Sequence, residues 1–199
     1  MLVFSKAKLV LLATPKTGST ALHDFLAPHA DVAALNPPGM KHMPAYRYQR
    51  FFVPLLAACG LKNLHTMAFI REPVDWLSSW YRYRSRPALI GHKNSTAEMD
   101  FDSFVRAYMQ EERPPYADVG SQFVFLSGLD GESGVNHLFR YEEMDGAVAF
   151  LSRRLGIEIA LEQKNVSPQR PAELSPETRE QLQDHLAHEF NLWQQARCR

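Results

Sequence analysis

The chain has 199 residues, a length that suits one domain with a sizeable hydrophobic core. Hydrophobic residues make up 45% and charged residues 22%, which is an ordinary globular composition. Lys and Arg together number 22, as do Asp and Glu, so the formal net charge is zero. This balance argues against a general nucleic-acid binder and against a long polyanionic partner, although it is compatible with a local basic pocket.

The apolar runs are much shorter than the ~20 residues that a membrane-spanning helix needs, so we expect no membrane association. The N-terminal stretch MLVFSKAKLVLLAT contains lysine among its apolar residues and leads directly into a polar turn. We expect it to form a strand rather than a signal peptide. The two cysteines, Cys59 and Cys198, are too few for a disulfide framework and lie in no metal-ligand spacing. We therefore expect a cytoplasmic location.

Three apolar runs are typical of buried strands, and they cover residues 9–14, 65–70 and 135–141. Segments with helical periodicity lie between and after them, which predicts helices over residues 17–26, 53–59, 73–83, 101–111, 147–155 and 175–193. Residue types that favour helix ends occur at several of these limits: Gly60, Pro73, Gly156 and Ser175.

Strands that alternate with helices predict an α/β fold with a central, mainly parallel sheet flanked by helices. The whole chain, 1–199, is expected to form a single domain. Two stretches do not fit the alternation: residues 36–50 are rich in proline and aromatic side chains, and residues 86–100 are polar and irregular. We expect both to be loops, which often carry binding and catalytic residues.

A polar stretch, TPKTGST over residues 14–20, lies between the first predicted strand and the first predicted helix. Such a turn aims backbone N–H groups at one point, and the helix N-terminus adds partial positive charge, so phosphate-like anions bind there. Gly18 allows close approach of the backbone, and Lys16 adds a full charge. The GxxxxGK[ST] pattern of ATP-binding P-loops is absent, because the lysine precedes the glycine. The alternative is a capped helix whose lysine has no ligand.

A second stretch, REPVDWLSSWY, places Arg71 at the end of a predicted strand and Ser79 two turns into the next helix. An arginine and a hydroxyl at that edge can clamp a second phosphate. The alternative is a surface arginine paired with Glu72 or Asp75. The nearby run RYRSR over residues 82–86 is typical of a solvated helix face; its second interpretation is contact with an acidic acceptor or the nucleotide.

Together the two stretches resemble the sulfotransferases that use 3′-phosphoadenosine 5′-phosphosulfate (PAPS) and release 3′-phosphoadenosine 5′-phosphate (PAP). In that family a PKTGST-type loop holds the 5′-phosphosulfate and an RxPxxxxxSxY-type motif holds the 3′-phosphate. The second motif is matched at its spacing by Arg71, Pro73, Ser79 and Tyr81. Trp76 stands where many members have an arginine. The resemblance implies a three-layer P-loop-like fold and a donor site that consists of Pro15, Lys16, Thr17, Gly18, Ser19, Thr20, Arg71, Ser79 and Tyr141.

Three further segments resemble parts of the same family, so the resemblance covers nearly the whole chain. The segment KHMP over residues 41–44 is similar to a KTHLP-type segment, with one residue fewer, whose histidine is the catalytic base. The segment RYEEM over residues 140–144 is similar to one whose tyrosine, here Tyr141, contacts the adenine side. NVS over residues 165–167 and the helix ending in EFNLW resemble the C-terminal part of bacterial members. The family's RKG-type loop is absent, and the candidates to replace its charge are Lys164 and Arg170.

The resemblance implies in-line sulfuryl transfer from PAPS to a hydroxyl or amine of an acceptor. Lys16 neutralises charge on the leaving oxygen, His42 takes the acceptor proton, and Lys41 assists at the sulfuryl oxygens. Some family members use a carboxylate as the base, so Glu142 or Glu143 is the alternative. No metal is expected, because basic groups and a helix end supply the charge.

Two other functions fit the sequence: an atypical P-loop kinase that uses ATP, and a catalytically silent protein of the same fold that binds PAP. We expect a small-molecule or glycan acceptor, and zero net charge argues against a highly sulfated glycan. No nucleic-acid partner is expected. In the run VGSQFVF over residues 119–125, Gln122 is expected on a helix surface and Phe123 in the core, with the acceptor pocket as their second interpretation.

Overall fold

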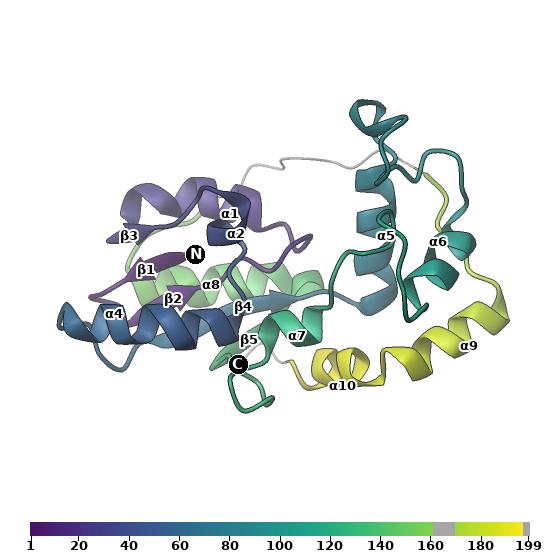
Figure 1. Ribbon diagram of the computed structural model, residues 1–199. Coiled ribbons are helices and arrows are strands. Elements are labelled where there is room, and N and C mark those ends of the chain that lie inside the picture. Colours follow the sequence, from purple (N-terminus) through teal and green to yellow (C-terminus); the bar gives the residue numbers. More distant parts are fainter. Residues whose placement is uncertain (161–169, 197–199) are drawn as a thin grey trace.

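The computed structural model describes residues 1–160 and 170–196. These residues form a mixed α/β structure on an open five-stranded sheet with the order β3-β1-β2-β4-β5 (Figure 1). The strands are β1 (Leu2–Phe4), β2 (Leu9–Leu11), β3 (Val32–Ala33), β4 (His65–Ile70) and β5 (His137–Arg140). β2 pairs in parallel with β4, and β4 pairs in parallel with β5. β1 is antiparallel to both β2 and β3, so it runs against the other strands of a mostly parallel sheet.

The N-terminal stretch is a hairpin, where the sequence predicted one strand. β1 turns back into β2 at residues 5–8, and Lys8 adopts a left-handed backbone conformation with a φ of 49°. The Asp31 carboxylate accepts hydrogen bonds from both the backbone N–H and the hydroxyl of Ser5, at 2.6 and 2.7 Å. β2 itself ends earlier than the predicted 9–14, although the backbone N–H of Leu12 still donates to the Met67 carbonyl at 2.8 Å.

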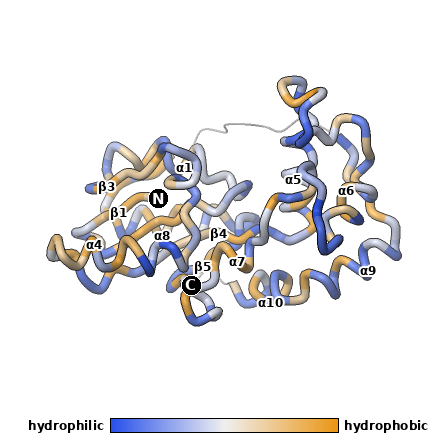
Figure 2. Tube along the Cα trace, viewed as in Figure 1, coloured by the Kyte–Doolittle hydropathy of each residue, from blue (hydrophilic) through white to orange (hydrophobic). Residues whose placement is uncertain are grey.

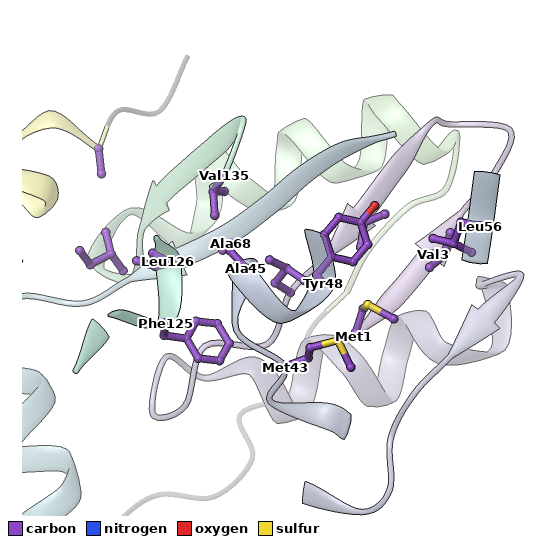
Figure 3. Packing of buried hydrophobic residues seen from close by; sticks show 14 residues of the cluster. Met1, Val3, Met43, Ala45, Tyr48, Leu56, Ala68, Phe125, Leu126 and Val135 are labelled. Carbon is purple, nitrogen blue, oxygen red and sulfur yellow. The ribbon is translucent and has the colours of Figure 1, made fainter. Parts of the chain in front are cut away.

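Alternate residues of the strands face two separate hydrophobic cores, as the period of two in a strand requires. One face contributes Leu9, Leu11 and Met67 to a core covered by the helices α1 (Ser19–Leu26) and α8 (Met144–Leu155). The other face contributes residues such as Val10 and Ala68 to a core that includes Tyr48, Leu56 and Phe125 (Figure 3). That core is covered by α3 (Ala45–Arg47), the π-helical turn η2 (Tyr48–Phe52), α4 (Val53–Ala58) and α7 (Gln122–Leu126). Figure 2 shows the hydrophobic residues concentrated along the strands.

A third core lies beyond the end of β4 and is formed by helices (Figure 1). These helices are α5 (Pro73–Arg84), α6 (Phe101–Tyr108) and α9 (Pro176–His185). Tyr81, Phe101 and Phe104 are almost fully buried there, with ring centroids 5.4 to 6.2 Å apart. This helical core fixes the direction in which α5 leaves the sheet.

Several sequence expectations need correction. The predicted loop 36–50 contains the short helix α2 (Pro38–Lys41), followed by α3 and the start of η2. The predicted helix 175–193 is two helices, because the chain bends at Leu186 between α9 and α10 (Ala187–Gln195). By contrast, the predicted loop 86–100 is confirmed, with one 3₁₀ turn, η3 (Pro87–Leu89), inside it. In the described part of the chain, every helix is too short or too polar to cross a bilayer.

Candidate functional site

The turn between β2 and α1 has an unusual backbone. Lys16 and Gly18 both adopt left-handed conformations, with φ angles of 65° and 64°. Gly18 lies against Tyr141, because a Cβ added to Gly18 would be 2.8 Å from Cε2 of that ring. A side chain at residue 18 would therefore collide with Tyr141 as well as strain the backbone. Gly18 is the N-cap of α1 and offers no side chain to the helix, so the first N–H groups of α1 have no N-cap side chain as acceptor.

The hydroxyl groups of the turn have protein partners. The Thr17 hydroxyl donates to the Thr14 carbonyl at 2.9 Å, and the Ser19 hydroxyl donates to the same carbonyl at 3.5 Å. The Thr20 hydroxyl accepts from the Lys41 ammonium group at 3.5 Å. The Thr17 and Ser19 contacts lie within the turn, and the Thr20 contact joins the turn to α2. Contact of these hydroxyls with a ligand stays a prediction.

The Lys16 ammonium group lies against two aromatic rings of α5. Its Nζ is 4.2 Å from the ring centroid of Tyr83 and 5.7 Å from that of Trp80, distances typical of cation–π contacts. Burial, followed by the nearby charges of Arg71 and Arg86, lowers the pKa of Lys16 to about 8. Lys16 is thus a partly desolvated cation among other cations, a setting that favours a bound anion.

Arg71 connects the end of β4 to the turn. Its Nη1 donates to the Lys16 carbonyl at 3.1 Å, and its guanidinium carbon lies 4.6 Å from the ring centroid of Tyr141. Its Nε also pairs with Asp75 at 2.7 Å, so the ion pair that the sequence offered as the alternative is present. Arg71 therefore contacts the predicted donor loop and carries a carboxylate partner at the same time.

Two residues that the sequence did not assign hold this arrangement together. The indole N–H of Trp76 donates to the Pro15 carbonyl at 3.0 Å, so the residue that replaces the family arginine ties α5 to the turn. The Gln122 side chain makes a reciprocal pair of hydrogen bonds with the backbone of Arg71, at 2.9 and 2.8 Å. Gln122 is buried, where the sequence predicted a surface position, and Phe123 is only half-buried. Ser79 lies on α5 and is 6% exposed.

The segment containing Lys41 and His42 contacts Thr20 of the turn and Ala13 just before it. His42 Nδ1 is 2.7 Å from the Ala13 carbonyl, which can only accept, so Nδ1 carries the proton. In the neutral imidazole, Nε2 is then the unprotonated nitrogen. Burial is the main cause that lowers the pKa of His42; the hydrogen bond to Ala13 raises it, and the charge of Lys41 lowers it further. His42 is thus held in the tautomer and charge state that a general base requires.

A second histidine lies beneath this segment. His23 of α1 is fully buried, and neither of its ring nitrogens has a hydrogen-bond partner among the described residues. Burial, followed by positive groups that include Lys41 and His42, lowers its pKa to about 3. An imidazole in this setting remains uncharged at neutral pH.

The alternative carboxylate bases have structural partners. The Glu142 carboxylate accepts from the backbone N–H of Glu72 at 2.8 Å and from the indole N–H of Trp193 at 3.1 Å. The Glu143 carboxylate accepts from Arg140 at 3.3 Å. The Glu142 contacts link the segment after β5 to the start of α5 and to α10.

The candidates to replace the missing RKG-type loop do not contribute a described contact to the site. Arg170 donates to the backbone carbonyls of Thr96, Ala97 and Met99 at 2.8, 3.1 and 2.6 Å, so its charge is directed to another loop. Lys164 and the segment 165–167 lie outside the described residues. Within the described ranges, no group of three His, Cys, Asp or Glu side chains could hold a metal ion.

A separate hollow of about 560 Å³ lies away from the turn, near the ends of α6 and α9. It is lined by Met109, Gln110, Glu111, Arg113, Asp118 and His185. It contains none of the residues that the sequence assigned to a donor or catalytic site. No model of a known protein family matches the chain, and no curated protein matches it either.

Proposed function

We propose that the protein is a PAPS-dependent sulfotransferase with a three-layer, P-loop-like fold. The observation that carries the proposal is the convergence of Lys16, Arg71 and His42 on one turn. The turn follows β2 and Arg71 follows β4, and these neighbouring strands are parallel, so both groups lie at the carboxyl edge of the sheet. That edge is where open α/β sheets bind their ligands.

In this proposal the 5′-phosphosulfate of PAPS binds at residues 15–20, and its 3′-phosphate binds Arg71 and Ser79. The uncapped N–H groups of α1 and the ammonium group of Lys16 supply the positive charge for the phosphosulfate. Tyr141, which lies on Gly18 and Arg71, contacts the adenosine.

The transfer step uses His42 as general base and Lys41 and Lys16 as charge stabilisers. The acceptor oxygen or nitrogen forms a bond to sulfur as the bond from sulfur to the phosphate oxygen of PAP breaks. His42 Nε2 takes the proton of the acceptor, and Lys16 stabilises the charge on the departing oxygen. The neutral His42 tautomer supports this role.

We propose the reducing cytoplasm as the setting of this reaction, and the exposed free thiol of Cys59 is consistent with it.

The test is sulfuryl transfer from labelled PAPS to a panel of phenols, alcohols, amines and sugars. Lys16→Ala is expected to reduce turnover by about 100- to 1,000-fold, the scale for loss of one charge-stabilising group. It should retain the far-ultraviolet circular dichroism of the wild type, because Lys16 lies in a turn and not in a core. Near-normal turnover by this variant would contradict the proposal.

Thermal stabilisation by ligands distinguishes the ATP-using kinase from the two functions that bind PAP. A sulfotransferase or a silent binder is stabilised by PAP and not by ATP with Mg²⁺, whereas a kinase shows the reverse preference. Stabilisation by PAP without transfer to any acceptor of the panel would leave the silent binder as the better description.

A further inference from the structure

Three arginines lie near the C-terminal end of α5, and their hydrogen bonding differs. Arg82 Nε donates to one backbone carbonyl at 2.9 Å, and Arg84 donates to two backbone carbonyls at 2.6 and 3.0 Å. Arg86 Nε is buried and has no hydrogen-bond partner among the described residues. A buried donor on a charged group is destabilising when it lacks a partner, because it has lost its hydrogen bonds to water. Among these three arginines, Arg86 is therefore the one with a buried donor that has no partner among the described residues.

Arg86 shares an aromatic ring with Lys16. Its guanidinium carbon lies 3.5 Å from the ring centroid of Tyr83, and the Lys16 ammonium nitrogen lies 4.2 Å from the same centroid. The ion pairs formed by the described residues involve neither cation. Two cations on one ring repel each other, and an anion near both of them would relieve that repulsion.

The proposed donor does not require this second cation at the ring. Its phosphosulfate is accounted for by Lys16 and the start of α1, and its 3′-phosphate by Arg71 and Ser79. Arg86 has no role in binding the donor. It lies next to Lys16, which in the proposed function marks the end of the donor from which the sulfuryl group departs. The molecule expected on that side of the sulfuryl group is the acceptor.

We propose that Arg86, stacked on Tyr83, binds an anionic group of the acceptor, so that the acceptor is a hydroxyl or amine compound that also carries a carboxylate, sulfate or phosphate. This inference rests on the proposed function, because it takes Lys16 as the marker of the reacting end of the donor. A neutral acceptor of the same shape leaves the Arg86 donor unpaired and is discriminated against for that reason.

Sulfate titration of the PAP-saturated protein tests the anion site without knowledge of the acceptor. Trp80 lies 5.7 Å from Tyr83 between ring centroids, so tryptophan fluorescence can report binding at constant ionic strength. Arg86→Gln is expected to weaken sulfate binding at least tenfold. Arg84→Gln is the matched control, because Arg84 also lies over Trp80 but its donors already have partners; it should leave the affinity unchanged. PAP affinity should stay within about threefold in both variants.

Unchanged sulfate affinity in Arg86→Gln overturns the proposal. An equal loss of PAP affinity also overturns it, since that result assigns Arg86 to the donor. Failure of the wild type to bind PAP contradicts the proposed function instead, and sulfate titration without PAP then still tests Arg86.

Where the acceptor panel gives turnover, a phenol with a carboxymethyl group is compared with its amide. Arg86→Gln should lower kcat/KM at least tenfold for the acid and leave the amide unchanged; equal losses contradict the proposal.

Discussion

The histidines and the lysine on the two flanks of the β2–α1 turn differ in charge state at neutral pH. On the α2 flank, formed by His23, Lys41 and His42, burial lowers the pKa of His23 to about 3 and lowers that of His42. On the α5 flank, formed by Lys16, Arg71 and Arg86, burial lowers the pKa of Lys16 to about 8. The same physical cause, desolvation of a cation, therefore acts on both flanks.

The outcome differs because the side chains start from different pKa values. An imidazole begins at 6.5, so any lowering makes it neutral at physiological pH and able to accept a proton. A lysine begins at 10.5, so it remains largely protonated after the shift. One partly buried turn can thus hold an uncharged base on one side and a charged group on the other. Acid–base chemistry and charge stabilisation need this combination.

The largest expected effect concerns the α2 flank. His42→Ala should reduce sulfuryl transfer by about 10²–10⁴-fold, the usual contribution of a general base. PAP affinity should change by no more than about threefold, since His42 faces the acceptor in this mechanism. Steady-state kinetics with labelled PAPS and a titration with PAP measure the two effects separately.

The pH profile of kcat/KM gives the control for His42. The wild-type rate should fall as the pH drops through the His42 pKa, which lies below 6.5, and it should fall again above about pH 8 as Lys16 loses its proton. Glu142→Gln should keep the acid limb, because its carboxylate has structural partners. If His42→Ala keeps both the rate and the acid limb, a carboxylate or the acceptor itself supplies the base.

The second effect concerns stability on the same flank. The folded-state pKa of His23 is below its unfolded value of 6.5, so the unfolded chain binds the proton more tightly. The contribution of the neutral His23 to the free energy of unfolding is complete above pH 6.5 and is lost as the pH falls towards about 3. Between pH 6.5 and pH 4 this amounts to about 3 kcal/mol at 1.36 kcal/mol per pH unit. Urea unfolding at several pH values should show this slope, and His23→Leu should flatten it. An unchanged slope in the variant would assign the acid sensitivity to other groups.

Hydrophobic periodicity was sufficient to predict the parts of the fold that have long apolar runs. β4 was predicted with its observed limits, and helices were predicted at the positions of α1, α4 and α5. β1 and β3 have three and two residues, too few for periodicity to indicate a strand. The helix α2 begins at a proline within a proline-rich stretch, where local composition favours a loop.

The sequence was sufficient to select the basic residues of the candidate site, but not the residues that hold them in place. Local patterns were enough to single out Lys16, Arg71 and His42. The hydrogen bond from Trp76 to Pro15 joins residues 61 positions apart, and the pair of Gln122 with Arg71 joins residues 51 positions apart. No local pattern encodes such contacts, because they form only when separate elements pack together. For Arg71 the ion pair with Asp75 is present, and the arginine also donates to the turn, while its contact with a phosphate stays a prediction.

The smallest expected effect tests the α5 flank through Arg71. A charge-assisted hydrogen bond contributes about 1.5–3 kcal/mol, so Arg71→Ala should weaken PAP binding at least tenfold. Adenosine 5′-phosphosulfate lacks the 3′-phosphate and should lose much less affinity. Arg71 also donates to the Lys16 carbonyl, so part of the loss is shared by both ligands.

Asp75→Asn separates the two roles of Arg71. The asparagine side chain keeps an oxygen acceptor for Arg71 Nε but removes the negative charge, and Asp75 is partly exposed, so the fold should tolerate the change. Removal of that charge leaves Arg71 more attractive to a phosphate, and PAP affinity should be equal to or higher than that of the wild type. Isothermal titration of both variants with both ligands measures these differences. Equal losses of PAP and adenosine 5′-phosphosulfate in Arg71→Ala would mean that the arginine supports the turn and does not recognise the 3′-phosphate.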